Sequence, residues 1–184
     1  MTVDPSQNGR WISSVVEQFE QPLVRYALSI TGDLDHARDV VQETFLRLVR
    51  QERSGQAHVP QELGAWLFKV CRNQAIDVQR KDKRMRAVSQ EVFASSSALD
   101  DARPMDAEDT KDDVVKLVAN LVHNQQEVVR LRFEHGLSYR EISEVTGLTV
   151  TNVGYLLHAA IQNLRKQLQK VAEPREAARQ EKIR

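Results

Sequence analysis

The stretch from Gly136 to Val153, GLSYREISEVTGLTVTNV, has the residue types and spacing of a unit that recognises DNA. Ser138 stands three residues before Glu141, which is the capping-box spacing that begins a helix. Gly147 ends this helix in a tight turn, and Thr149 can cap a second, longer helix. The pattern is that of a helix-turn-helix, whose second helix lies in the DNA major groove. An ordinary αα-hairpin packed in a core would also fit.

A second candidate for nucleic-acid binding is a group of cations late in the helical stretch 62–88. Its members are Lys69, Arg72, Arg80, Lys81, Lys83, Arg84 and Arg86. Only Asp77 and Asp82 oppose them, so positive charge is concentrated here. Such a group suits binding to a phosphate backbone. A basic helix end is also commonly a solvated face that interacts well with the helix dipole.

Catalytic and metal-binding patterns are absent from the sequence. It contains no glycine-rich phosphate loop, paired-histidine motif or nucleophile elbow. None of the histidines lies at metal-ligand spacing to another; they are His36, His58, His123, His135 and His158. The single cysteine, Cys71, lies in a helical run and is interpreted as a small buried side chain. We therefore expect no enzymatic activity, no metal and no cofactor.

The composition allows one large domain or two small ones in 184 residues. The formal net charge is zero, so nucleic-acid binding must be argued from the distribution of charge. No apolar run approaches the roughly 20 residues that span a bilayer. The polar start, MTVDPSQNGR, lacks a signal-peptide core. We expect a cytoplasmic protein without membrane insertion.

Apolar residues recur at helical spacing along most of the chain, and no strand-like alternation appears, so the predicted fold is all-α. A first helix is predicted over 11–19. Pro22 suits the first turn of a second helix that ends at 31–33. Asp35 is the predicted cap of the next helix, and Asn124 with Glu127 is the predicted cap of the helix before Gly136.

The composition changes abruptly at 94–113, ASSSALDDARPMDAEDTKDD. Serines, a proline and many carboxylates, with few large apolar residues, are typical of a flexible linker. The sequence therefore predicts two small helical domains joined by a flexible acidic linker, with the helix-turn-helix in the second domain. The end of the chain, VAEPREAARQEKIR, is predicted to be a frayed polar tail.

Taken together, three segments resemble the extracytoplasmic-function (ECF) group of bacterial RNA polymerase sigma factors. DHARDVVQETFLRL is similar to the helix that docks on core polymerase, and WLFKVCRNQAIDVQRKDKR is similar to the minus-ten reader. NQQEVVRLRFEHGLSYREISEVTGLTVTNV is similar to the minus-thirty-five reader. The resemblance assigns 1–93 to sigma region 2, 94–112 to the linker, 113–172 to sigma region 4 and 173–184 to the tail.

The resemblance implies a protein that binds core RNA polymerase and promoter DNA and directs transcription initiation. It implies core-polymerase contacts at Asp39, Gln42, Glu43 and Leu46. It implies minus-ten contacts at Asn73, Asp77, Arg80, Lys83 and Arg84, where unstacked bases are read and phosphates are held. It implies minus-thirty-five contacts at Ser138, Arg140, Thr149, Thr151, Asn152, Tyr155 and His158. An anti-sigma factor is a further candidate partner that the sequence leaves open.

The recognition helix departs from the family pattern after Val153. The family has a Lys-Ser-Arg run here, whereas this chain has Gly154, Tyr155 and Leu156. The helix therefore lacks cations that would contact phosphates, and Gly154 costs about 1 kcal/mol in a helix interior. We expect weaker minus-thirty-five binding or a different promoter sequence.

Two other functions remain open at this stage. One is a transcription regulator that binds DNA alone through the helix-turn-helix. The other is a helical adaptor that has lost promoter reading, although the retained cations at 72–86 argue against it. The promoter sequence and the inducing signal do not follow from these residues.

Overall fold

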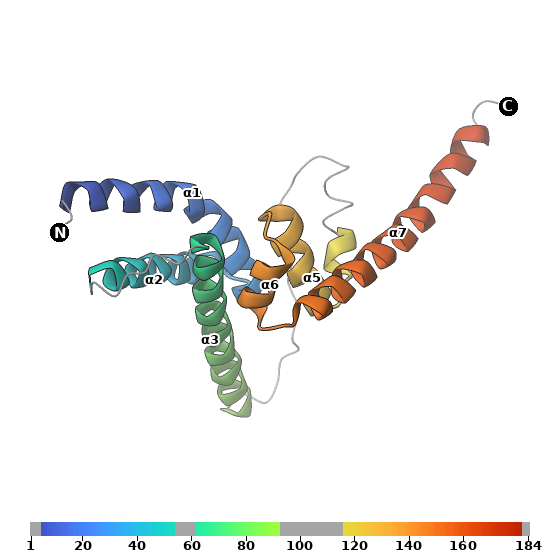
Figure 1. Cartoon of the computed structure of the whole chain (residues 1–184). Coiled ribbons are helices and arrows are strands. Elements are labelled where there is room, and N and C mark those ends of the chain that lie inside the picture. Colours follow the sequence, from blue (N-terminus) through green and yellow to red (C-terminus); the bar gives the residue numbers. More distant parts are fainter. Residues whose placement is uncertain (1–4, 54–61, 93–115, 182–184) are drawn as a thin grey trace. The chain divides into compact units, whose positions relative to one another are not determined.

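The computed structural model describes residues 5–53, 62–92 and 116–181 of the chain, with side chains described over 10–52, 62–85 and 116–169. Every regular element in these ranges is helical, which confirms the all-α prediction (Figure 1). The chain divides into two compact units, Met1–Ala102 and Arg103–Arg184. The predicted linker at 94–112 lies outside the described residues, so its exact bounds stay a prediction. No helix in the described ranges combines the length and apolarity needed to cross a membrane.

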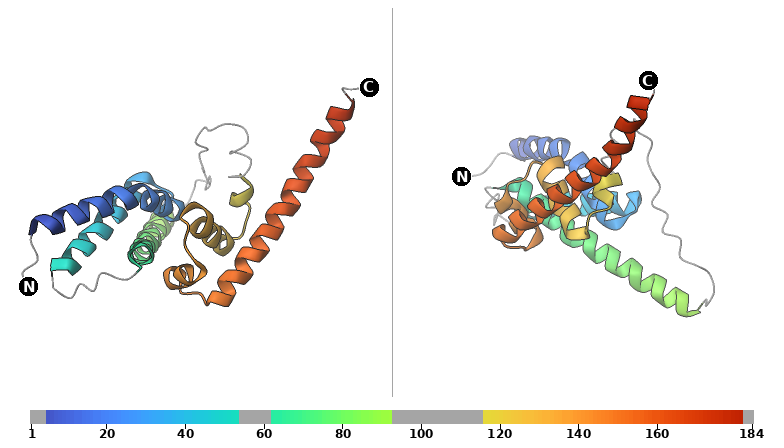
Figure 2. Two further views of the ribbon diagram at one scale, coloured as in Figure 1. Left: turned by 45° about the horizontal axis from the view of Figure 1, so that its top comes forward. Right: turned by 90° about the vertical axis from the view of Figure 1, so that its right-hand side faces the viewer.

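The first unit consists of α1 (Pro5–Thr31), α2 (Leu34–Arg53) and α3 (Leu63–Val92), each packed against the other two. Their shared core is apolar and includes Leu23, Tyr26, Ala27, Val40, Val41, Leu67, Phe68, Cys71 and Ala75. The Tyr26 and Phe68 rings meet edge to face with their centroids 5.3 Å apart. The C-terminal end of α3 extends beyond α1 and α2 in Figure 1 and in the right-hand view of Figure 2.

The prediction that Pro22 begins a helix was wrong, because α1 continues through it. An internal proline removes one backbone hydrogen bond and costs about 3 kcal/mol. Here Val15 before the proline and Leu23, Tyr26 and Ile30 after it are all buried in one core. Burying such side chains contributes about 1.5–3 kcal/mol each, which outweighs the loss. Figure 1 shows α1 bending along its length, as an internal proline would cause.

The predicted cap of α2 at Asp35 was also wrong, because Asp33 fills that role. The Oδ1 atom of Asp33 accepts a hydrogen bond from the His36 backbone N–H at 2.8 Å. Gly32, with φ of +72°, ends α1, and its N–H donates to the Leu28 carbonyl at 2.9 Å. The turn between α1 and α2 is therefore shorter than the sequence indicated. The residue that caps α2 is Asp33, which stands directly before the helix.

The second unit contains α5 (His123–Val129), a π-helical turn η1 (Arg130–Glu134), α6 (Tyr139–Thr146) and α7 (Val150–Glu181). The core of this unit is formed by Leu117, Leu121, Val128, Leu131, Leu137, Ile142, Val145, Val153, Leu157 and Ala160. Because α7 lies against α5 and α6, the two helices of the predicted helix-turn-helix share one core.

Three details of the second unit differ from the predictions. Asn124 does not cap α5 as predicted, and no other side chain caps this helix. The Gln126 amide instead donates to the Ala119 and Leu121 carbonyls at 2.9 and 2.7 Å. Val150 and Leu168 continue the helical spacing of apolar residues along α7, which predicts that they face inward, but both are exposed. The predicted frayed tail is helical as far as Glu181, because α7 continues through Pro174.

Candidate nucleic-acid interface

The helix-turn-helix begins at the capping box that the sequence predicts. The Ser138 hydroxyl accepts from the Glu141 backbone N–H at 3.2 Å, and Glu141 Oε2 accepts from the Ser138 N–H at 2.7 Å. These bonds satisfy two N–H groups that a helix start would otherwise leave unpaired. The Ser138 hydroxyl thus already accepts a hydrogen bond that fixes the start of α6. Its predicted contact with DNA would have to be made while that bond is kept.

The turn between α6 and α7 is fixed by local hydrogen bonds. Gly147 adopts a left-handed conformation, with φ of +76°, and its N–H donates to the Ser143 carbonyl at 2.9 Å. The Ser143 hydroxyl donates to the Leu148 carbonyl at 2.6 Å. Thr149 Oγ1 then accepts from the Asn152 N–H at 3.2 Å and caps α7, as predicted. A left-handed position of this kind strongly favours glycine, because a Cβ atom would be strained there.

The first turns of α7 divide into a buried and an exposed side. Val153, Leu157 and Ala160 are buried against the rest of the unit. The predicted base-reading residues are all exposed; they are Thr149, Thr151, Asn152, Tyr155 and His158. The Tyr155 side chain is 70% exposed, which is unusual for an aromatic residue without a partner. This side of α7 therefore presents hydroxyl, amide and imidazole groups, all able to hydrogen-bond to base edges.

The departure at Gly154 has a local structural counterpart. A Cβ atom at Gly154 would lie 3.7 Å from Cε2 of Tyr139, which is ordinary van der Waals contact. The Arg132 guanidinium lies 5.7 Å from the centroid of the same ring, and its Nη1 donates to the Leu137 carbonyl at 2.9 Å. A cation held above an aromatic ring is thus fixed near the glycine, although Arg132 was not among the predicted contacts.

The remaining predicted residue of this surface, Arg140, is exposed near the start of α6. Its Nε lies 3.5 Å from Glu144 Oε1, one turn further along the same helix. No lysine or arginine occurs between Arg140 and Arg165 in the sequence. The exposed side of the first turns of α7 therefore carries no lysine, arginine or carboxylate, and base reading there would depend on neutral hydrogen bonds.

The five predicted minus-ten residues lie on the exposed surface of α3. Asn73, Asp77, Arg80 and Arg84 follow one another at intervals of about one turn, so they share one face of the helix, and Lys83 lies beside them. Arg80 and Asp77 are 3.9 Å apart and both are well exposed, so their ion pair is weak. The structure therefore brings these residues together as a mostly basic strip.

The four predicted polymerase contacts follow one another at helical spacing on α2 but differ in their surroundings. Gln42 and Leu46 line an apolar groove of about 580 Å³ between α1 and α2, together with Ile12, Val16, Val41 and Phe45. Leu46 is 43% exposed. Glu43 instead pairs with two cations of its own helix, at 3.6 Å to Arg47 and 3.0 Å to Arg50. Asp39 is exposed but does not line the groove.

The buried cysteine is unsuited to chemistry. Burial raises the pKa of the Cys71 thiol to about 12, and the thiol faces the Leu23 carbonyl at 3.9 Å. A thiol that stays protonated is a poor nucleophile and a poor metal ligand. Among the described side chains, no group of histidine, cysteine and carboxylate residues is arranged to hold a metal ion.

A helix-turn-helix with an exposed hydrogen-bonding face, accompanied by a second helical unit with a basic strip, defines a DNA-binding transcription protein. Comparison with known families narrows this class. Residues 15–85 match the Sigma-70 region 2 family, and residues 111–164 match the Sigma-70 region 4 family. The first match covers α2 and the part of α3 that carries the basic strip, and the second covers the helix-turn-helix.

Individual relatives agree with this narrower class. The chain is 33% identical to the ECF RNA polymerase sigma factor SigL of Mycobacterium tuberculosis, over 83% of this chain and 86% of SigL. It is 27% identical to the ECF sigma factor SigM of Bacillus subtilis, over 84% of this chain and 93% of SigM. The solved structure of the sigma factor RpoE with the anti-sigma factor NepR, from Bartonella quintana, matches with a TM-score of 0.64. That match has 25% identity and covers 85% of this chain and 96% of RpoE.

The chain belongs to the ECF RNA polymerase sigma factors. It is therefore a sigma factor that directs transcription initiation with core RNA polymerase, and the resemblance drawn from the sequence is confirmed.

Proposed function

We propose that this sigma factor selects its promoter through two surfaces, the exposed side of α7 and the basic strip of α3. The observation that carries the proposal is the division of α7: its buried side fixes the helix, while Thr151, Asn152 and Tyr155 point outward. Asn152 can pair with adenine through two hydrogen bonds, and a good pair of this kind discriminates by about 1–3 kcal/mol. The minus-thirty-five sequence would then be read by neutral side chains.

Phosphate contacts would come from outside the recognition helix. Arg132 is held above the Tyr139 ring near Gly154, where the family has a lysine. Arg140 lies at the start of α6. These two arginines would partly replace the missing cations, since phosphate contacts position a protein and do not require a particular helix.

In the first unit, the strip on α3 would bind the minus-ten region. Arg80, Lys83 and Arg84 supply the charge that holds phosphates, and Asn73 and Asp77 supply groups that can read a base drawn out of the stack. The cations of the strip lie on the part of α3 beyond its last buried core residue, Ala75, where DNA can approach without displacing another helix.

Core polymerase would bind the surface of α2, with Gln42 and Leu46 at the apolar groove and Asp39 and Glu43 beside it. The groove would accept apolar side chains of a partner helix, because its lining is largely aliphatic and aromatic. An anti-sigma factor, as found with RpoE, would compete for the same unit. Both partnerships would be formed in the cytoplasm.

Promoter footprinting with and without core polymerase tests this proposal. A sigma factor protects specific promoter DNA only as part of the holoenzyme, whereas a stand-alone regulator protects it without polymerase. We expect protection near both minus ten and minus thirty-five with the holoenzyme, and none with the free chain. Specific protection by the free chain would favour the regulator. Protection confined to minus ten, together with a fully active Asn152→Ala variant, would exclude base reading by α7.

A further inference from the structure

The buried stripe of α3 ends before the helix reaches the cations of its basic strip, Arg80, Lys83 and Arg84. Phe68, Cys71 and Ala75 lie one turn apart and are all buried. The next positions on the same side of the helix are the half-buried Val78 and then Gln79 and Asp82, which are polar and half-buried. The apolar core therefore does not anchor the part of α3 that carries Arg80, Lys83 and Arg84, and polar contacts take over there.

Gln79 makes the first of these contacts. Its Nε2 donates to the backbone carbonyl of Ile30 at 2.7 Å, which joins α3 to the end of α1. Ile30 is the next-to-last residue of α1, so its carbonyl is one of those that the helix itself leaves without a partner. The bond therefore satisfies a polar group and also fixes the position of α3 at that level.

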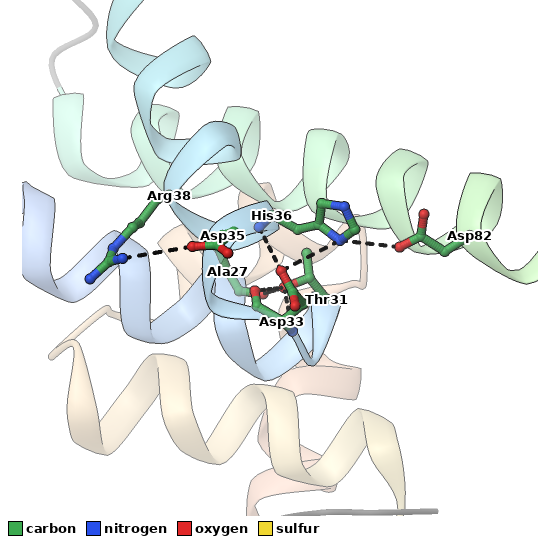
Figure 3. Close-up of polar contacts among 7 residues, drawn as sticks. All are labelled: Ala27, Thr31, Asp33, Asp35, His36, Arg38 and Asp82. Atoms are coloured by element: carbon green, nitrogen blue, oxygen red, sulfur yellow. Dashed lines mark hydrogen bonds and ion pairs between the residues drawn. The ribbon is translucent and has the colours of Figure 1, made fainter.

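The second contact joins α3 to the start of α2 (Figure 3). The Asp82 carboxylate lies 3.3 Å from Nδ1 of His36, and the Asp33 carboxylate lies 3.7 Å from the same nitrogen. Asp33 is itself fixed by the bond that it accepts from the His36 N–H. Two carboxylates therefore face the buried Nδ1 atom, at ion-pair distances and not in hydrogen-bond geometry.

We propose that Gln79 and the His36–Asp82 pair, together called the α3 clasp, position the basic strip of α3 for promoter opening. This inference rests on the proposed role of α3. The clasp has two effects: it orients the helix beyond the core, and it holds the Asp82 carboxylate against α2. Without it, Asp82 would be a free negative charge among Arg80, Lys81, Lys83 and Arg84, where it would repel phosphates.

The test uses holoenzyme assembled from the full chain and core polymerase on its cognate promoter. Promoter opening is measured as permanganate reactivity of unpaired thymines, and core affinity is measured separately by competition. Gln79→Met keeps the length of the side chain but removes the donor. We expect unchanged core affinity and roughly fivefold less opening, which corresponds to the loss of one ordinary hydrogen bond.

Asp82→Ala separates positioning from simple charge. If Asp82 acted only as a charge near DNA, its removal would strengthen opening, because phosphate repulsion would fall. The clasp predicts weaker opening. Asp35→Ala is the matched control, since it also removes one negative charge, from the start of α2 next to His36. The Asp35 side chain is 90% exposed and pairs with Arg38 of its own helix. This control should open the promoter like the wild type.

A reversed pair provides rescue. Asp82→Lys alone should weaken opening despite the added cation, and combining it with His36→Asp should recover most of the loss. Wild-type opening by Gln79→Met, or stronger opening by Asp82→Ala, would overturn the clasp. If Arg84→Ala then still reduced opening, the promoter role of α3 would stand without the clasp. If Arg84→Ala also had no effect, both the clasp and that role would fall.

Discussion

Replacing Gly154 with alanine tests how the recognition helix tolerates its departure from the family pattern. Gly154 lies inside α7, and its backbone φ is not positive, unlike that of Gly32, Gly136 and Gly147. Alanine is favoured over glycine in a helix interior by about 1 kcal/mol, largely because the unfolded chain has less freedom to lose. The new Cβ would touch Tyr139 at 3.7 Å without a clash. We therefore expect Gly154→Ala to stabilise the second unit.

The expected gain is about 1 kcal/mol in the free energy of unfolding, or roughly 4–8 °C in Tm for a unit of this size. Thermal unfolding followed by circular dichroism, supported by calorimetry, measures it in the full chain. Gly147→Ala is the control, because its φ of +76° strains any residue with a Cβ atom. That variant should lower the Tm of the same transition.

Unchanged or lower stability of Gly154→Ala would refute the reasoning, because it would mean that α7 is strained or differently packed at this point. If Gly154→Ala is more stable but transcribes poorly, the glycine is kept for close approach to DNA and not for the fold. If it is more stable and fully active, the glycine has no role in promoter binding.

Three further predictions concern other parts of the chain. Glu43→Lys should weaken co-purification with core polymerase while leaving the helical content unchanged, since surface substitutions usually shift stability by about 0.5 kcal/mol; undiminished binding would remove this residue from the interface. Asn152→Ala should lower transcription and relax the sequence preference at one or two base pairs of the promoter. Changing Lys166 should instead weaken DNA binding evenly across sequences and reduce its salt dependence. If both variants affected all promoter sequences equally, base reading by Asn152 would be contradicted. Cys71 should resist iodoacetamide at pH 9 in the folded chain, because its pKa is raised to about 12. Since an unfolded thiol titrates at about 8.5, stability should fall as pH rises from about 9 toward 12, and rapid labelling of the native chain would contradict the burial.

The helix-turn-helix was predictable from the sequence because its determinants are local. The capping box at Ser138 and Glu141, the left-handed Gly147 and the Thr149 cap all act within a few residues, and each appears as expected. The exposed side of α7 follows from the same helical spacing, although it does not reveal that Tyr139 and Arg132 approach Gly154 from another element.

The features that sequence reasoning missed depend on contacts between distant residues. Pro22 reads as a helix start, but the common core on both sides of it makes the helix continuous. His36, Gln79 and Asp82 are unremarkable in sequence, and their meeting depends on how α3 crosses the turn between α1 and α2. The available signal was weak: Gln79 and Asp82 continue the spacing of a buried stripe with polar residues.

Run-off transcription on genomic DNA fragments, with the chain and core polymerase supplied separately and together, tests the central claim most directly. A sigma factor predicts discrete transcripts from a small set of start sites only when both components are present. Those sites should share sequence elements at minus ten and minus thirty-five. Specific DNA binding by the chain alone, with no start sites gained on adding it to core polymerase, would contradict the account.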